Sequence, residues 1–167
     1  MPRHERPRTL AGARSAAYRL LTVQARTEAQ LRAALLRRGY SEEHVAEVMA
    51  EMVRLGYIDD VAAASRWAEY AAGERRYGVR GIASRLSGRG IDPELAAQAA
   101  QAAYEAEGVD EYQVAWDLAV LRISPGSQGE PPAGQLRERA LGRIARFLER
   151  RGFRADTISR VVRDLAK

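Results

Sequence analysis

The sequence predicts an all-α protein made of three tandem three-helix repeats. Residues that favour helices, above all Ala, Leu, Arg and Glu, dominate the 167-residue chain. In addition, one helix-ending pattern occurs three times, at residues 35–40, 86–91 and 148–153. Each copy has a Leu four residues before a Gly, an Arg directly before that Gly, and a bulky apolar residue after it. Recurrence of such a unit is typical of a helical-repeat protein.

Each glycine of this pattern is predicted to end an amphipathic helix in the left-handed conformation. Leu31 and Leu35 precede the first glycine as an i, i+4 apolar pair, and the same pair recurs as Ile82 with Leu86 and as Ile144 with Leu148. Apolar residues at helical spacing also follow each glycine. The repeating unit is therefore predicted to be helix, glycine turn, helix.

The first repeat is predicted to span residues 10–57, after a mobile basic arm at residues 1–9. Its first helix covers residues 10–26. Thr27 and Gln30 have the spacing of a capping box, and Ser41 has the chemistry of the next N-cap. The third helix is predicted to bury one stripe of apolar residues: Val45, Val48, Met49, Met52 and Val53.

The second repeat is predicted to span residues 58–108. Asp59 or Asp60 is expected to cap its first helix, although paired carboxylates could also serve acid/base chemistry or a metal. Trp67 is interpreted as a core anchor, with a base-stacking platform as the alternative. Asp92 followed by Pro93 marks the start of the last helix of this repeat, which is so rich in Ala that neighbouring helices can approach closely.

Positive charge, an aromatic residue and glycines come together in one segment, residues 74–81. Arg75, Arg76 and Arg80 could bind phosphates, and Gly78 with Gly81 has the spacing of a nucleic-acid-clamping loop. The segment lacks the Lys-Ser/Thr of a P-loop, and no strand precedes it. A plain connection between two helices is the alternative interpretation.

The third repeat is predicted to span residues 109–167 and to contain a flexible Pro/Gly loop at residues 124–134. Apolar residues at helical spacing, among them Trp116 and Val120, predict the helix before the loop. After the third glycine, Arg154 stands where the other repeats have Ser41 and Asp92, so Asp156 is expected to cap the last helix one turn later.

Charge and composition restrict the classes of function. The net charge is +5, and both ends of the chain are basic around an acidic middle. Basic ends favour an anionic partner such as nucleic acid, although the excess of Arg over Lys is also what a codon bias would produce. The absence of cysteine excludes disulfides and Cys-based metal sites. No export signal or membrane span is recognisable, so a cytoplasmic protein is expected.

Four blocks of the sequence, in this order and spacing, resemble the RecX regulatory proteins, which modulate the RecA recombinase. The blocks are Glu28-x-x-Leu31-Arg32-x-x-Leu35-x-x-Arg38-Gly39-Tyr40, Gly56-Tyr57-Ile58-Asp59-Asp60, Gly78-x-x-Gly81-Ile82-x-x-x-Leu86-x-x-x-Gly90-Ile91 and Leu148-x-x-Arg151-Gly152-Phe153. The chain departs from that family at Ala62-Ala63-Ala64, where an aromatic residue is often found, and in its Pro/Gly loop. The resemblance implies an elongated, curved stack of repeats that binds along RecA–DNA filaments and restrains their growth, ATP hydrolysis and strand exchange.

We therefore expect a non-enzymatic negative regulator in DNA repair, recombination and the SOS response. Its partners would be the RecA filament and, weakly and without sequence preference, single- and double-stranded DNA, and it would act as a monomer. No catalytic residue, cofactor or metal is expected. The alternative is a sequence-specific helix-turn-helix DNA-binding regulator. The candidate contacts with the partner or with DNA are Arg38, Arg75, Arg76, Arg80, Arg89 and Arg151.

Overall fold

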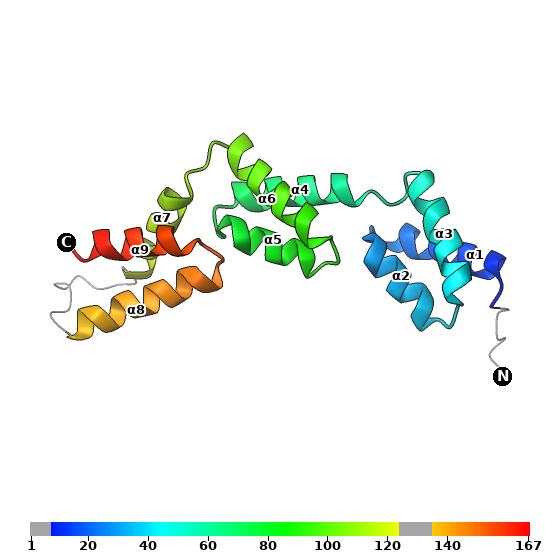
Figure 1. Cartoon of the computed structure of the whole chain (residues 1–167), viewed down its shortest axis with the longest axis horizontal. Helices are drawn as coiled ribbons and strands as arrows, with labels where there is room; N and C mark the ends of the chain where they lie inside the picture. The colour runs from blue at the N-terminus through cyan, green and yellow to red at the C-terminus, as the bar shows by residue number, and fades with distance from the viewer. Residues whose placement is uncertain (1–7, 124–134) are drawn as a thin grey trace. The chain divides into compact units, whose positions relative to one another are not determined.

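The computed structural model describes residues 8–123 and 135–167, and its regular structure there is helical throughout (Figure 1). The all-α prediction is confirmed for these residues. Most of the predicted N-terminal arm and the predicted loop at 124–134 lie outside them. The helices are α1 (Leu10–Val23), α2 (Glu28–Arg37), α3 (Glu42–Arg54), α4 (Asp60–Gly73), α5 (Val79–Ser87), α6 (Pro93–Ala106), α7 (Glu111–Ile123), α8 (Gln135–Arg150) and α9 (Ala155–Leu165).

The described helices form three successive groups of three, α1–α3, α4–α6 and α7–α9, each with a glycine turn between its second and third helix. By compactness the chain divides into two units. The first comprises Met1–Ala63 with Gly88–Ile91, and the second comprises Ala64–Ser87 with Asp92–Lys167. These are called the first unit and the second unit below. The exact repeat limits, residues 57 and 108, remain a prediction.

The first unit buries one face of each of its three helices. Leu31, Leu35, Val45, Val48 and Met52 are fully buried, and Ala13 and Ala17 bring α1 close to them. The predicted stripe of α3 is confirmed except at its end. Val53 is 46% exposed, because it lies farther round the helix from the centre of the buried stripe than Val48, Met49 and Met52 do.

The second unit is built on small residues in α4–α6 and on larger ones in α7–α9. Ile82 and Leu86 of α5 are buried, as are several alanines of α4 and α6, so the predicted Ala-rich helix does pack closely. Trp67 is only partly buried. Val120 lies 38% exposed on α7 and contributes less to the core than its spacing predicted. The core of the last group consists of Val114, Ala115, Ala119, Ile144, Leu148, Phe153 and Val161.

Helix ends follow the predicted local chemistry. Thr27 and Gln30 form the full capping box, and the side chains of Ser41 and Asp92 accept hydrogen bonds from the first turns of α3 and α6. Asp59 Oδ1 accepts from Ala62 N at 2.9 Å, so Asp59 caps α4. The three pattern glycines have left-handed φ angles, 81° at Gly39, 88° at Gly90 and 73° at Gly152, as predicted.

Candidate functional site

The segment at residues 74–81, called the arginine loop below, comprises the connection between α4 and α5 together with the first three residues of α5. It lies against the third glycine turn within the second unit. Gly78 N donates a hydrogen bond to the carbonyl oxygen of Arg151 at 3.0 Å. A Cβ atom on Gly78 would lie 2.5 Å from the Gly152 carbonyl oxygen, and one on Gly81 would overlap the Arg151 carbonyl. The two glycines therefore let one backbone touch another, which explains their spacing without a nucleic-acid ligand.

Tyr77 anchors the middle of the arginine loop. Its ring lies under the guanidinium of Arg85, 3.9 Å from the ring centroid, and Arg85 also donates to the Tyr77 hydroxyl. The hydroxyl of Tyr104, on α6, donates to the Tyr77 carbonyl oxygen. Burial raises the pKa of the Tyr104 hydroxyl, so it keeps its proton and acts as a donor.

Arg151, a candidate contact residue, makes contacts with other residues of the second unit. Its Nη1 donates to the Arg76 carbonyl oxygen at 2.9 Å. Its guanidinium also lies 5.1 Å from the centroid of Tyr77 and 5.0 Å from that of Phe147. Arg151 thus ties the arginine loop to α8 and positions it, in addition to carrying positive charge.

The other candidates divide between the two units. Arg75, Arg76 and Arg80 belong to the second unit with Arg151, and all three are exposed. Arg76 forms an ion pair with Glu74 at 3.4 Å. Arg38 and Arg89 belong to the first unit, where both side chains are exposed. The structure therefore gathers four of the six predicted contact residues around one loop.

Arg75 has a backbone conformation that is unusual for its residue type. Its φ is +50°, and within the described residues every other positive φ belongs to glycine. Its amide N donates to the Ala72 carbonyl oxygen at 3.0 Å, so Arg75 closes the end of α4 where a glycine is normally found. A left-handed non-glycine residue costs about 1–2 kcal/mol. This backbone cost at an arginine makes its side chain a candidate for a functional contact.

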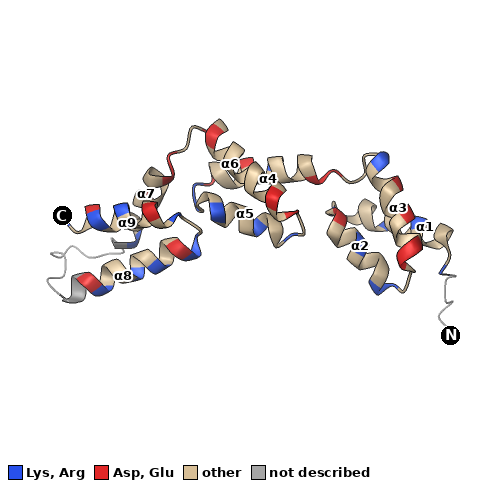
Figure 2. Ribbon diagram, viewed as in Figure 1, with Lys and Arg blue, Asp and Glu red and all other residues tan. Residues whose placement is uncertain are grey.

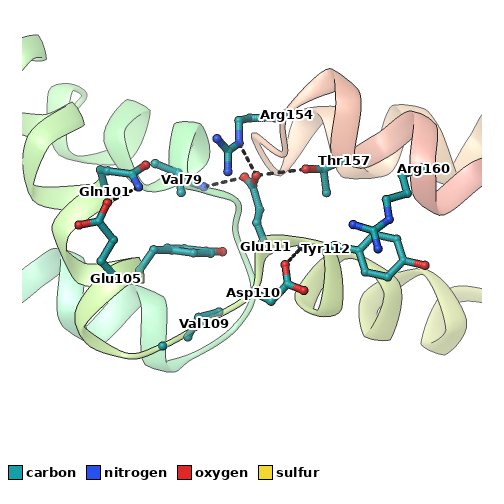
Figure 3. A pocket seen from close by; sticks show the side chains of 12 residues that line it. Val79, Gln101, Glu105, Val109, Asp110, Glu111, Tyr112, Arg154, Thr157 and Arg160 are labelled. Carbon is teal, nitrogen blue, oxygen red and sulfur yellow. Dashed lines mark hydrogen bonds and ion pairs between the residues drawn. The ribbon is translucent and has the colours of Figure 1, made fainter.

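Glu111, which sequence reasoning did not single out, joins three elements of the second unit (Figure 3). Its side chain is only 4% exposed. Oε1 accepts from Val79 N, the first residue of α5, at 3.2 Å, while Oε2 accepts from Arg154 Nε at 2.6 Å and from Thr157 Oγ1 at 3.3 Å. One carboxylate thus caps α5 and holds the start of α9.

The Glu111–Arg154 pair also explains why α9 lacks a side-chain cap. Arg154 occupies the N-cap position without a capping hydrogen bond, and its side chain extends to Glu111 instead. That hydrogen bond and the negative charge of Glu111 raise the pKa of the Arg154 guanidinium, which therefore stays charged. The expectation that Asp156 caps α9 one turn later is wrong: the helix already begins at Ala155, so Asp156 lies inside its first turn, where it accepts only from the adjacent Thr157 N at 2.9 Å.

The same arrangement is found in the first unit. Asp60 accepts from Glu28 N, the first residue of α2, at 3.1 and 3.3 Å. Asp60 and Glu28 are 32 residues apart, as are Glu111 and Val79. Burial raises the pKa of the Asp60 carboxyl, partly offset by the Glu28 hydrogen bond. The available sequence signal was the recurrence of Ile58-Asp59-Asp60 as residues 109–111, Val-Asp-Glu.

The second glycine turn occupies an equivalent place in the first unit. Thr27 Oγ1 donates to the Arg89 carbonyl oxygen at 2.9 Å, and a Cβ on Gly90 would lie 2.7 Å from Ala29 Cβ. Gly90 therefore lies close to the start of α2, as Gly152 lies close to the start of α5. Close backbone approach is a repeated use of these turns, beyond ending a helix.

A cavity of about 380 Å³ opens beside Glu111 (Figure 3). Its wall carries Glu105, Asp110 and Glu111 but also Arg154 and Arg160, so neither sign of charge prevails. The Arg160 guanidinium lies over the Tyr112 ring, 4.1 Å from its centroid. Within the residues that the structure describes, no group of three or more His, Cys, Asp or Glu is placed to hold a metal ion.

A loss of stability is expected when Arg151 is replaced by alanine, because one charge-assisted hydrogen bond and two ring contacts disappear. We expect the free energy of unfolding of the second unit to fall by about 1–2 kcal/mol. Arg151→Lys should recover only part of the loss, since an ammonium keeps the charge but not the planar contacts. Urea unfolding measures both variants. Full recovery by lysine would contradict the positioning role.

The fold is shared with solved RecX structures. A crystal structure of RecX from Lactobacillus salivarius superimposes with a TM-score of 0.70, at 20% sequence identity, covering 94% of this chain and 96% of that one. A second crystal structure, of a regulatory protein RecX, also gives 0.70, at 22% identity, covering 93% of this chain and 71% of that one. No helix in residues 8–123 or 135–167 is long and apolar enough to cross a membrane.

The fold, together with the contacts that connect its helices, defines a helical-repeat protein. A family model described as RecX, first three-helix domain, matches residues 13–52. The Regulatory protein RecX of Amycolatopsis mediterranei is 32% identical over 141 residues, which cover 84% of this chain and 75% of the relative. That of Thermobifida fusca is 31% identical over 154 residues, covering 92% and 78%. The chain belongs to the RecX family of regulatory proteins.

Proposed function

We propose that this protein is a cytoplasmic negative regulator of RecA, which binds RecA–DNA filaments and inhibits their growth, their ATPase and strand exchange. The observation that carries the proposal is the similarity, over most of both chains, to proteins named Regulatory protein RecX. The mechanism is binding as a monomer rather than catalysis. A protein bound across neighbouring RecA subunits would hinder both assembly and the conformational cycle that ATP hydrolysis drives.

The arginine loop is one part of the second unit that suits such a contact. Three exposed cations, Arg75, Arg76 and Arg80, project from a backbone that Gly78, Gly81 and Arg151 fix in place. A fixed backbone lowers the entropy lost when these side chains bind. Their charge suits an anionic partner, either the DNA phosphates or an acidic surface of the filament.

The overall proposal is tested with purified RecA. Adding this protein in stoichiometric amounts at low salt should slow DNA-dependent ATP hydrolysis and strand exchange. The same experiment with heat-denatured protein controls for non-specific effects. If both rates are unchanged by the native protein, the chain is not a RecA inhibitor.

Charge reversal in the arginine loop tests the site itself. The triple variant Arg75→Glu, Arg76→Glu, Arg80→Glu should bind RecA–DNA filaments more weakly. If phosphates are the partner, the salt dependence should also flatten, because each lost phosphate contact reduces the slope of log K against log salt by about 0.7–0.9. Fluorescence anisotropy with labelled filaments at several salt concentrations measures both effects.

A matched control carries the same charge change on exposed arginines of the first unit. Arg19→Glu, Arg37→Glu and Arg54→Glu together serve this purpose, since all three side chains are exposed. We expect the control to bind more strongly than the loop variant. Equal losses would assign the effect to net charge, and an unaltered salt slope in the loop variant would exclude phosphate contacts by this loop.

The helix-turn-helix alternative is less well supported. Helix α3, which follows the first turn, begins with Glu42 and Glu43, a poor combination for approaching phosphates. Helix α9 carries no net charge, because Asp156 and Asp164 balance Arg160 and Arg163. Arg160 lies over Tyr112, and Arg154, directly before the helix, pairs with Glu111. A footprint on one defined duplex sequence in the absence of RecA would favour this alternative.

A further inference from the structure

Four arginines lie on one face of α8, at residues 139, 143, 146 and 150. The intervals of four, three and four residues place them along a single stripe of a helix. All four side chains are exposed, whereas Ile144 and Leu148 on the opposite face are buried. We call Arg139, Arg143, Arg146 and Arg150 the arginine stripe. Figure 2 shows the basic segments of this helix in blue.

No member of the arginine stripe forms an ion pair with another described residue. The ion pairs of the described residues involve Arg14, Arg32, Arg76, Arg154 and Lys167, and none involves a member of the stripe. The described acids of α8, Glu138 and Glu149, lie to one side of it by helical geometry. Four like charges on adjacent turns repel one another, and an external anion would relieve this repulsion.

A glycine lies beside the stripe in the middle of the helix. Gly142 has an ordinary helical φ, and a Cβ added there would meet only Arg146 Nη1, at 3.6 Å, among the described atoms. Alanine would therefore fit and would make the helix more stable. Gly142 contrasts with Gly81 and Gly152, which internal contacts require. A glycine without an internal role next to exposed cations lets a ligand approach the helix backbone.

We propose that the arginine stripe and Gly142 form a binding surface for the phosphodiester backbone of DNA. At a rise of 1.5 Å per residue the four arginines extend over about 16 Å, which corresponds to about five phosphates at 3.4 Å per strand. Guanidinium groups match phosphate oxygens bidentately. This inference deepens the proposed function by naming a surface for the DNA of the filament, and it rests on that function only for its role with RecA.

The composition of the stripe favours a phosphate backbone over an acidic protein. Protein–protein interfaces are enriched in aromatic side chains and Met as well as in Arg, whereas this face presents Arg and Gly. A row of cations suits a partner whose charges also form a row. The contacts would be with the backbone, so binding should show no preference for sequence.

The test compares two triple variants on naked DNA, a labelled oligo-dT and a labelled duplex, between about 50 and 200 mM salt. The stripe variant is Arg139→Ala, Arg143→Ala, Arg146→Ala, and the control is Arg19→Ala, Arg37→Ala, Arg54→Ala, with the same change in net charge. The stripe variant should reduce the slope of log K against log salt by about 2 for oligo-dT and by about 3 for duplex. Its affinity at low salt should fall at least about tenfold, and the control should change little.

Several results would overturn the proposal. Equal losses in the two variants would assign binding to net charge, and an unchanged salt slope would remove the stripe from the interface. If the stripe variant bound naked DNA normally but no longer inhibited RecA, an acidic protein surface would be the partner. Conversely, if the native protein failed to inhibit RecA while the stripe variant still lost DNA binding, the proposed function would fail and the DNA surface would stand.

Gly142→Ala tests the close approach separately. The substitution should raise the unfolding temperature and yet lower DNA affinity several-fold, because the added methyl group separates the helix from the phosphates. Gly73→Ala is the matched control: this helical glycine also has free space, with no atom within 4 Å of an added Cβ. It should not lower the unfolding temperature, and it should leave DNA affinity unchanged. Unchanged affinity in Gly142→Ala would contradict a role for that glycine.

Discussion

Replacing Gly81 by alanine should lower the free energy of unfolding of the second unit by about 3 kcal/mol or more. The added Cβ would overlap the carbonyl oxygen of Arg151, a backbone atom that cannot move aside as a side chain can. Relieving the overlap would separate α5 from the third glycine turn. The hydrogen bond from Gly78 N to Arg151 would then be lost, together with the contacts that Arg151 makes with Tyr77 and Arg76.

The two tryptophans make this loss measurable in one part of the chain. Trp67 lies in α4 and Trp116 in α7, so both report on the second unit. In Gly81→Ala the midpoint of denaturant unfolding, followed by tryptophan fluorescence, should move to a lower denaturant concentration. Far-UV circular dichroism, in contrast, also reports on the helices of the first unit. Gly73→Ala is the control and should not destabilise, because the added Cβ has free space at the end of α4. An unchanged fluorescence midpoint in Gly81→Ala would refute the close backbone contact.

Removing the Glu111 carboxylate has the second largest expected effect. Glu111→Ala should cost about 2–4 kcal/mol, because Val79 N and Thr157 Oγ1 lose an acceptor and Arg154 loses its ion-pair partner. Arg154 is 48% exposed and can return to water, which keeps the loss below that of a fully buried pair. Glu111→Gln should cost less, since an amide oxygen still accepts hydrogen bonds.

The neighbouring acid provides the control for this experiment. Asp110 accepts only a local hydrogen bond in the described structure, from Tyr112 N at 3.0 Å, so Asp110→Ala should cost about 1 kcal/mol. A double-mutant cycle of Glu111→Ala with Arg154→Ala isolates the ion pair. If Glu111→Ala costs no more than Asp110→Ala, Glu111 is an ordinary first-turn acid and does not join the three elements.

Local structure was predictable because its causes lie within a few residues. Thr27 with Gln30, Ser41, Asp92 and the glycines of the three turns are recognised from side-chain chemistry next to an apolar stripe. Reasoning from neighbouring residues alone also produced the wrong predictions of burial. Val53 and Val120 fit a broad helical spacing, but only the packing of neighbouring helices decides where a buried stripe ends.

The contacts that connect one helix to another over long sequence distances were not predictable in the same way. Asp60 and Glu111 act on backbone amides 32 residues earlier, and no periodicity of a single helix encodes such a contact. The roles of Gly78 and Gly81 likewise depend on a turn more than 60 residues away in sequence. The positively charged candidates were visible from the sequence, but the internal engagement of Arg151 required the structure. The stripe on α8 could have been found from its spacing alone.

The caps supplied by Asp60 and Glu111 have a consequence for the order of synthesis. A chain leaves the ribosome from its N-terminus, so α2 emerges before Asp60 and α5 before Glu111. Helix α5 lacks its Glu111 cap and its backbone contact with Arg151 until the chain has been made as far as that turn. Each of these helices is therefore completed by a later part of the chain. Nascent chains halted before residue 111 should leave the start of α5 open to proteolysis.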